Sequence, residues 1–223
     1  MKNFALKALI AWVTLAAPGL FAQNLLLNSN FESGNLNFWT LFATPNGGLG
    51  PGLPNVISFD TAGTGTPSDA AQFQVGEVNF DATQQGGGFY QAFTSSAGQY
   101  VLSANIAARD VNLANSDAGT FSLSIDGISL ANLSLGSINP SQTIRGTLGA
   151  TVALSAGLHI FQFEITRGFQ DAGGLGNTPL EYVDNLSVTA VPEPSGLCLF
   201  GLAALLVAAV KRKMGKIPGA AAN

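Results

Sequence analysis

The sequence is poor in the residues that most catalytic and metal sites need. It contains one cysteine, Cys198, and one histidine, His159, in 223 residues. Cys198 lies in an apolar run near the C-terminus, so residues 23–190 have no cysteine for a disulfide, a thiolate metal site or a nucleophile. The sequence also lacks a Gly-x-Ser-x-Gly elbow, a His-Glu-x-x-His helix and a phosphate-binding loop. These absences argue against most classes of enzyme.

Charge is also scarce, and it is almost all of one sign. Charged residues make up 10% of the chain, and residues 23–190 contain no lysine. Twelve acidic residues in this range face only three arginines, Arg109, Arg145 and Arg167, which leaves a net charge of −9. Such a surface repels phosphate backbones, so we expect no nucleic-acid partner. It can attract divalent cations, although acidity that keeps an exported protein soluble is the simpler interpretation of most of these carboxylates.

The first 22 residues have the layout of a secretory signal peptide. Lys2 and Lys7 come before an apolar stretch at residues 8–17. A Pro-Gly pair ends this stretch shortly before Ala22. We expect an N-terminal signal peptide helix that is cleaved after Ala22, because the apolar stretch is short for a membrane span. An uncleaved N-terminal anchor is the alternative, since Leu20 is large for its position before the cut.

Residues 24–190 alternate short apolar–polar patterns with turn residues, and no window keeps a helical apolar stripe for three turns. The spacing predicts strands over residues 89–94, 100–109, 121–130, 158–167 and 182–189. Asp126-Gly127 is expected to form a tight hairpin turn within the third of these segments. Residues 45–54 and 61–68 are expected to be loops, and residues 84–88 lead into the strand over residues 89–94. Evenly spaced short strands of this kind predict an all-β sandwich or barrel.

The strand over residues 158–167 is expected to place its aromatic residues in the core. Phe161, Phe163 and Ile165 share one parity, and His159 has the same parity at the start of the strand. We therefore interpret His159 as a packed histidine and not as a catalytic base.

Three segments together resemble galactose-binding-like jelly rolls and related carbohydrate-binding modules. They are NLLLNSNFESG at residues 24–34 followed by Trp39, AGLHIFQF at residues 156–163, and VDNLSV at residues 183–188. The resemblance implies a jelly-roll β-sandwich over residues 23–190 with a structural Ca²⁺ near its terminal strands. Carried over, the calcium ligands are Glu32 and Asp184, and carboxylates with backbone carbonyls are the oxygen ligands that Ca²⁺ takes. The alternative is that both are exposed or locally hydrogen-bonded turn residues.

The same resemblance implies binding of a glycan, whose rings stack on exposed aromatic side chains beside amides or arginine. Tyr90, Asn105 and Arg109 are the candidate ligand-binding residues. Each also has a structural interpretation, with Tyr90 and Trp39 in the core and Arg109 paired with a nearby acid. We predict that the protein is not an enzyme; a glycoside hydrolase with paired carboxylates is the less favoured alternative.

The C-terminal region combines three parts in order: a short segment that contains a Pro-Glu-Pro triplet, an apolar run and a basic cluster. These are Val191, Pro192, Glu193 and Pro194, then residues 195–210, then Lys211, Arg212 and Lys213. As a helix the apolar run is about 24 Å long, against a bilayer core of about 30 Å, so it spans only marginally. The cations place the tail, residues 214–223, in the cytoplasm and the sandwich outside. The prolines keep the preceding triplet extended.

This arrangement resembles the PEP-CTERM sorting signal of exported proteins in Gram-negative bacteria that make exopolysaccharide. The resemblance implies processing by an exosortase near Pro192-Glu193-Pro194, with residues 195–210 as a transmembrane helix in the inner membrane during sorting. The protein would then reach the cell surface or the extracellular matrix. A plain tail anchor is the alternative. The expected role is non-catalytic, either binding glycan or serving as a purely structural matrix protein.

Overall fold

The computed structural model describes residues 23–110, 112–171 and 178–192. The predicted signal peptide, the predicted transmembrane helix and the sorting residues from Glu193 onward, including the basic cluster, lie outside these residues. Residues Gln23–Val191 form one compact unit. Every regular element in the described part of the chain is a β-strand, and none of it forms a helix long and apolar enough to cross a membrane.

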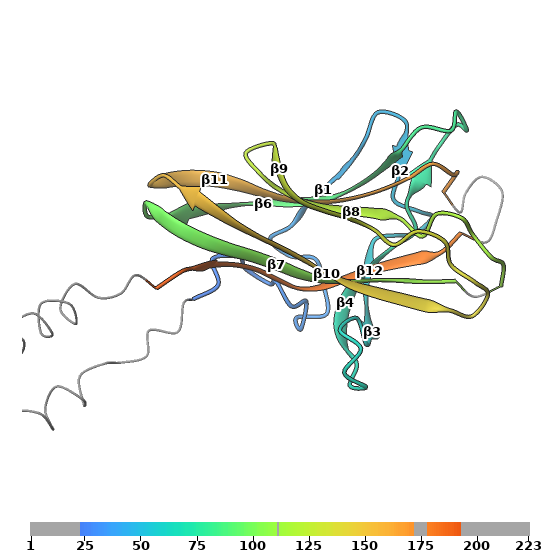
Figure 1. Cartoon of the computed structure of the whole chain (residues 1–223), viewed down its shortest axis with the longest axis horizontal. Coiled ribbons are helices and arrows are strands. Elements are labelled where there is room, and N and C mark those ends of the chain that lie inside the picture. Colours follow the sequence, from blue (N-terminus) through green and yellow to red (C-terminus); the bar gives the residue numbers. More distant parts are fainter. Residues whose placement is uncertain (1–22, 111, 172–177, 193–223) are drawn as a thin grey trace, which may run out of the picture. The chain divides into compact units, whose positions relative to one another are not determined.

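Two five-stranded antiparallel sheets face each other as the layers of a sandwich (Figure 1), which confirms the predicted fold class. The first, here the β6 sheet, has the order β1 (Thr40–Ala43), β6 (Gln85–Ser95), β11 (Gly157–Arg167), β8 (Thr120–Ile125) and β9 (Ile128–Ser134). The second, the β7 sheet, has the order β10 (Thr143–Leu154), β7 (Gly98–Arg109), β12 (Leu180–Ala190), β4 (Ser68–Phe73) and β3 (Asn55–Phe59). A short pair joins β2 (Gly47–Gly48) to β5 (Gly76–Glu77).

The alternation in the sequence decides which side chains of each strand enter the core. In β7 the even-numbered residues from Tyr100 to Ile106 are buried, whereas the odd-numbered residues between them are more exposed. At the β8–β9 hairpin, Asp126 and Gly127 have φ angles of 52° and 77°. Two successive left-handed residues form the type of two-residue turn whose twist matches the flanking strands, as the sequence predicted.

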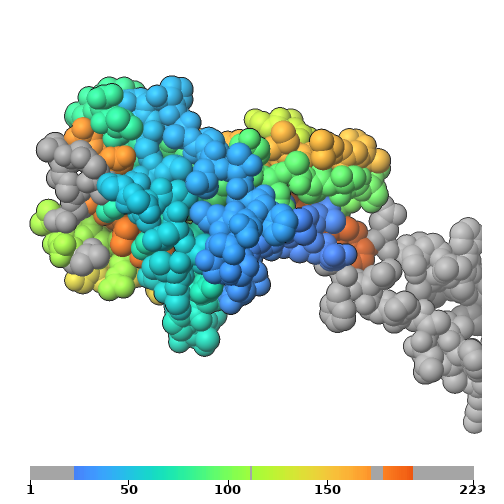
Figure 2. Space-filling view, turned by 180° about the vertical axis from the view of Figure 1, so that it is seen from behind, coloured from blue at the N-terminus to red at the C-terminus, as the bar shows by residue number. Residues whose placement is uncertain are grey.

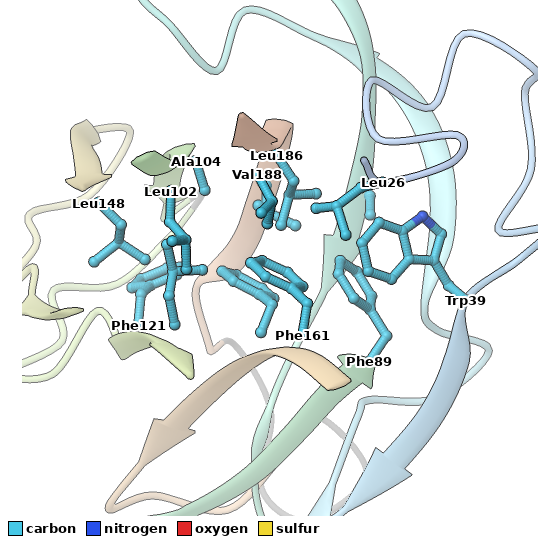
Figure 3. Packing of buried hydrophobic residues seen from close by; sticks show 14 of the residues in the cluster. Leu26, Trp39, Phe89, Leu102, Ala104, Phe121, Leu148, Phe161, Leu186 and Val188 are labelled. Carbon is cyan, nitrogen blue, oxygen red and sulfur yellow. The ribbon is translucent and has the colours of Figure 1, made fainter. Parts of the chain in front are cut away.

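Aromatic rings from the β6 sheet form the centre of the core, and aliphatic side chains of the β7 sheet pack onto them (Figure 3). The ring centroids of Phe89 and Phe163 lie 5.3 Å apart, and Trp39 lies 4.5 Å from Phe89. The indole Nε1 of Trp39 donates a hydrogen bond of 3.0 Å to the carbonyl oxygen of Asn28. The single polar atom of this indole is therefore satisfied within the sandwich, and the predicted burial of Trp39 is confirmed.

Two segments differ from the expectations. The glycine run at residues 86–88 belongs to β6, whereas the predicted strand begins at Phe89. A Cβ at any of these three glycines would collide with a backbone carbonyl oxygen of a neighbouring strand, so the run allows a close approach of three strands. The opening segment, residues 24–34, forms one bridge from Asn24 to Thr189 and then turns, because Asn28 and Phe31 adopt left-handed backbone angles.

The two ends of the sandwich differ. Tight turns join β6 to β7 and β10 to β11 at one end, which is also where the described chain begins and ends. The β5–β6 and β9–β10 connections lie at the opposite end (Figure 1). We call these the terminal end and the loop end.

Candidate functional site

The outward face of the β6 sheet carries an aromatic pair beside polar side chains. The ring centroids of Phe42 in β1 and Tyr90 in β6 lie 6.4 Å apart. The strand register places Gln162 of β11 next to Tyr90, and Gln162 Nε2 donates a hydrogen bond of 3.3 Å to Glu164 Oε2. We call this surface, made of Phe42, Tyr90, Gln162 and Glu164, the aromatic face.

Gly88 leaves a gap in the side chains of the aromatic face. Its register partners are Phe42 on one side and Glu164 on the other. A Cβ at this position would collide with the carbonyl oxygen of Phe163, so no side chain can stand between the ring and the carboxylate. Ser122 of β8 continues the row beyond Glu164. The aromatic face therefore places ring surface beside donors and acceptors of hydrogen bonds.

The structure separates the three residues predicted to bind ligand. Asn105 and Arg109 lie on the outward face of β7, in the other sheet, whereas Tyr90 points out of the β6 sheet. Asn105 is the register partner of Asp184, and its Oδ1 accepts a hydrogen bond of 3.5 Å from Thr147 Oγ1. Tyr90 and the two β7 residues therefore lie on opposite surfaces of the sandwich and cannot contact one small ligand together.

β3 and β4 form one edge of the β7 sheet, and the segment after β3 protrudes from the surface (Figure 2). The rings of Phe59 and Tyr182 are stacked at 3.7 Å with an interplanar angle of 2°. The Arg145 guanidinium lies 5.9 Å from the Phe59 ring centroid, and its Nε donates a hydrogen bond of 2.8 Å to the carbonyl oxygen of Asp60. This stack leaves Tyr182 only 2% exposed, so the aromatic surface on this side is occupied by the protein itself.

Glu32 and Asp184, the predicted calcium ligands, are brought close enough to interact, together with Asp69. Asp184 is 1% exposed, and burial raises the pKa of its carboxyl group. Hydrogen bonds from Ser68 and Asn185 oppose that rise in pKa, while the nearby charges of Glu32 and Asp69 add to it. The Ser68 hydroxyl donates to Asp184 Oδ2 at 2.6 Å, and the Asp69 backbone N–H donates to Glu32 Oε1 at 3.1 Å.

Sequence reasoning missed Asp69, because nothing in its local sequence marks it as a partner of residues more than thirty positions away on either side. Within the described residues, no group of three or more His, Cys, Asp or Glu side chains is already arranged to hold a metal ion. The cluster is a concentration of negative charge with an incomplete ligand set.

A second buried polar group lies at the loop end. Arg167 and Glu181 are both fully buried, with Arg167 Nε 3.7 Å from Glu181 Oε1. Burial raises the pKa of Glu181 to about 8, against the opposing effect of the Arg167 charge. Val75 donates its backbone N–H to Glu181 Oε2 at 3.0 Å, and Arg167 donates to the carbonyl oxygens of Asp117 and Val75. These contacts connect β11, β12 and two loop segments. Arg167 and Glu181 therefore have a structural role.

The fold and surface define an all-β sandwich module whose last strand leads into a C-terminal signal. The model of the PEP-CTERM protein-sorting motif matches residues 190–213, which confirms the resemblance predicted for the C-terminal region. A motif of this kind implies an exported protein. The match begins at the last residue of β12, and no curated protein matches the sequence.

Similar solved structures include carbohydrate-binding modules. TmCBM61, solved in complex with beta-1,4-galactotriose, is 10% identical and has a TM-score of 0.43, with 76% of this chain and 100% of that chain covered. The CBM22-1 xylan-binding domain from Paenibacillus barcinonensis Xyn10C is 12% identical and has a TM-score of 0.42, with 77% and 97% covered. The enzymatically active domain of bacteriophage CBA120 tailspike protein 4 is 14% identical and has a TM-score of 0.44, with 75% and 21% covered. Scores of this size carry no argument about ligands or activity.

Proposed function

We propose that this exported protein is a non-catalytic component of the cell surface or exopolysaccharide matrix, and that it binds glycan on the aromatic face. The observation that carries the proposal is Tyr90 beside Phe42 on the outward face of the β6 sheet. The adjoining positions of β11 and β8 present the amide of Gln162, the carboxylate of Glu164 and the hydroxyl of Ser122. A sugar ring has apolar C–H faces and a hydroxyl edge. An aromatic pair flanked by Gln162 and Glu164 suits both parts.

The distribution of carboxylates supports a non-catalytic role for this face. Glycoside hydrolysis ordinarily needs two carboxyl groups about 5 to 9.5 Å apart across the scissile bond. Among the strand residues of the β6 sheet, Glu164 is the single carboxylate. It would therefore accept hydrogen bonds from sugar hydroxyls, not act as half of a catalytic pair.

The C-terminal segment would determine where the module is delivered. We propose that an exosortase recognises and processes the chain at Pro192-Glu193-Pro194, after residues 195–210 have held it in the inner membrane of a Gram-negative bacterium. The position of the motif directly after β12 supports this order of events. The processed sandwich would then remain at the cell surface or in the matrix, where polysaccharide is its partner.

Retention on immobilised polysaccharides tests the glycan proposal. We expect the protein to be retained on at least one matrix polysaccharide, and Tyr90→Ala to lose that retention while keeping its melting temperature within a few degrees. Phe80→Ala is the matched control, because Phe80 is an aromatic residue that is 61% exposed in the β5–β6 connection. It should bind like the parent protein.

Three results would contradict parts of the proposal. If the parent protein is retained on no polysaccharide, a purely structural matrix protein is favoured. If Tyr90→Ala binds as well as the parent, the site lies elsewhere. Release of sugar products during incubation would show catalysis and overturn the non-catalytic role.

We also propose that Ca²⁺ binds at Glu32 and Asp184, with Asp69 as a third carboxylate. The supporting observation is that Asp184 is buried near two other carboxylates, and that both of them raise its pKa. Oxygen-rich, negatively charged surroundings are what Ca²⁺ selects, and the ion would relieve the repulsion among the three groups. When the ion binds, the Glu32 carboxylate would give up its hydrogen bond from the backbone N–H of Asp69 and coordinate the ion instead.

Melting curves with Ca²⁺ and with EDTA test this second proposal. We expect a lower midpoint in EDTA for the parent protein and no difference between the two conditions for Glu32→Gln or Asp184→Asn. Glu164→Gln, which removes a carboxylate on the other sheet, should keep the full difference. An unchanged midpoint in the parent protein would overturn calcium binding.

A further inference from the structure

The last strand of the sandwich runs into the sorting motif without a linker. β12 ends at Ala190, where the match to the motif begins, and the Val191 backbone N–H donates a hydrogen bond of 2.8 Å to the carbonyl oxygen of Gln99. Five residue steps separate Ala190 from Ser195, the first residue of the apolar run, and an extended chain covers at most about 18 Å over that length. Any surface that holds the apolar run must therefore lie close to the terminal end.

The terminal end carries very little charge. No charged residue occurs in residues 86–108, 127–134 or 185–192, and the only ionisable side chain in residues 146–163 is His159, which is paired with Asp126. The loop end and its connections hold a large share of the charged side chains, namely Glu77, Asp81, Arg109, Asp110, Asp117, Arg167, Asp171 and Glu181. Strands of this length extend about 35 Å, so the two ends are well separated.

Exposed aliphatic side chains gather toward the terminal end of the β6 sheet, two of them on the outward face of β11 and one in the β8–β9 hairpin. Leu158 is 72% exposed, Ile128 is 67% exposed and Ile160 is 44% exposed. Leu158 and Ile160 lie on the same face of β11. Asp126, in the turn before Ile128, donates its backbone N–H to the carbonyl oxygen of Ile160, and its side chain accepts a hydrogen bond from the backbone N–H of Ile160. Figure 2 shows the strand tips at the end where the chain leaves the sandwich. We call Ile128, Leu158 and Ile160 the aliphatic tip.

We propose that the aliphatic tip rests on the lipid surface of the membrane while the chain is anchored there. This inference rests on the proposed anchoring through residues 195–210. The short connection from Ala190 brings the terminal end to the bilayer, and apolar side chains gain free energy when lipid replaces the water around them. The acidic loop end is repelled by anionic headgroups, so the charge distribution favours the same orientation.

Fluorophores at the two ends of the full-length chain test this orientation. Cys198→Ser removes the only native thiol, and Leu158→Cys or Val78→Cys then gives one labelling site. Val78 is the matched control, because it is an aliphatic residue that is 52% exposed and follows β5 at the loop end. The labelled proteins are reconstituted into vesicles of phosphatidylethanolamine and phosphatidylglycerol that contain a nitroxide-labelled lipid.

We expect the label at position 158 to lose fluorescence to the nitroxide lipid and to be shielded from iodide in the water, with the reverse at position 78. Equal quenching at both positions, in protein that floats with the vesicles, would overturn the tip proposal and leave the anchoring intact. Protein that does not float would overturn the anchoring and the tip proposal together. Introducing Ile128→Asp and Ile160→Asp should reduce the lipid quenching at position 158, and unchanged quenching would exclude a role for these side chains.

Discussion

The imidazole Nδ1 of His159 lies 2.7 Å from Asp126 Oδ2, and its Nε2 lies 3.1 Å from the carbonyl oxygen of Ser155. The histidine therefore joins the β8–β9 turn to the β10–β11 turn at the terminal end of the sandwich. It is 7% exposed, as the parity of its strand predicted, and both ring nitrogens are engaged. A packed structural histidine accounts for all of these contacts.

The first prediction concerns the titration of this pair. The hydrogen bond between the two side chains raises the pKa of His159 above 6.5 and lowers the pKa of Asp126 below 3.8. The contribution of protonated His159 to the free energy of unfolding is at its full value below pH 6.5, and it is lost as the pH rises through the pKa of His159 in the folded state. The stability from Asp126 is complete above pH 3.8 and is lost as the pH falls through its folded pKa.

NMR titration of the imidazole checks this, because the chain contains a single histidine. In Asp126→Asn we expect the pKa of His159 to fall, because the hydrogen bond to the Asp126 carboxylate is the largest of the effects that raise it. Glu164→Gln should leave the titration unchanged. A pKa of 6.5 or lower in the parent protein would contradict the pairing.

The second prediction tests the aromatic core. Phe163 is fully buried against Phe73, Phe89 and Phe121. Phe163→Ala should lower the free energy of unfolding by about 3–5 kcal/mol, because it removes a ring and leaves a cavity. The exposed control Phe80→Ala should change it by less than about 0.5 kcal/mol. Urea unfolding measures both values, and similar effects from the two variants would place Phe163 outside the core.

The third prediction compares two strand glycines. A Cβ at Gly88 would collide with the Phe163 carbonyl oxygen, whereas the nearest atom to a Cβ at Gly149 is the Leu102 carbonyl oxygen at 3.8 Å. Gly88→Ala should therefore destabilise the protein by about 1–3 kcal/mol through overpacking. Gly149→Ala should stabilise it by about 0.5–1 kcal/mol, because alanine loses less backbone freedom on folding. Thermal melts distinguish the two, and the opposite order would contradict the close approach of the strands at Gly88.

The fourth prediction concerns Glu181, whose pKa burial raises from 4.5 to about 8. Because the folded state holds the proton more tightly than the unfolded state, the stability from this group is complete below pH 4.5 and is lost as the pH rises toward 8. Glu181→Gln cannot ionise. We therefore expect it to gain stability relative to the parent protein between pH 4.5 and pH 8, with no further gain at higher pH.

Urea unfolding of both proteins across this pH range measures that difference. Asp60→Asn is a control, because Asp60 is a carboxyl group near the protein surface whose pKa is lowered. Its difference from the parent protein should stay constant across this range, because a carboxyl group with a lowered pKa loses its contribution to stability only at pH values below about 3.8. A pH-independent difference for Glu181→Gln would show that Glu181 is ionised in the folded state throughout.

Local patterns were enough to predict most of the architecture. Alternation in residues 100–106 and 161–165 identified the inward faces of β7 and β11, and Asp126-Gly127 located the hairpin turn. These features depend on neighbours within a few residues. The strand predicted over residues 89–94 did not include the glycine run at residues 86–88, because the reason for that run is the close approach of strands β1 and β11, which are distant in sequence.

The candidate site was less predictable, for the same reason. Asp69 reaches the Glu32 and Asp184 pair only because β4 lies beside β12, and Phe42 reaches Tyr90 only because β1 lies beside β6. The spacing of residues along the sequence does not predict either contact. At the level of sequence, Arg167 and Glu181 entered only through the net charge, although folding buries both.

The sequence by itself determined the C-terminal sorting motif, the all-β class and the side of each predicted strand that enters the core. These are properties of contiguous residues, so they can be recognised before the chain folds. Only the tertiary structure decided that Tyr90 lies on one surface of the sandwich and Asn105 with Arg109 on the other. Alternation shows that a side chain points outward, but the pairing of distant strands determines which sheet it belongs to and which residues lie beside it.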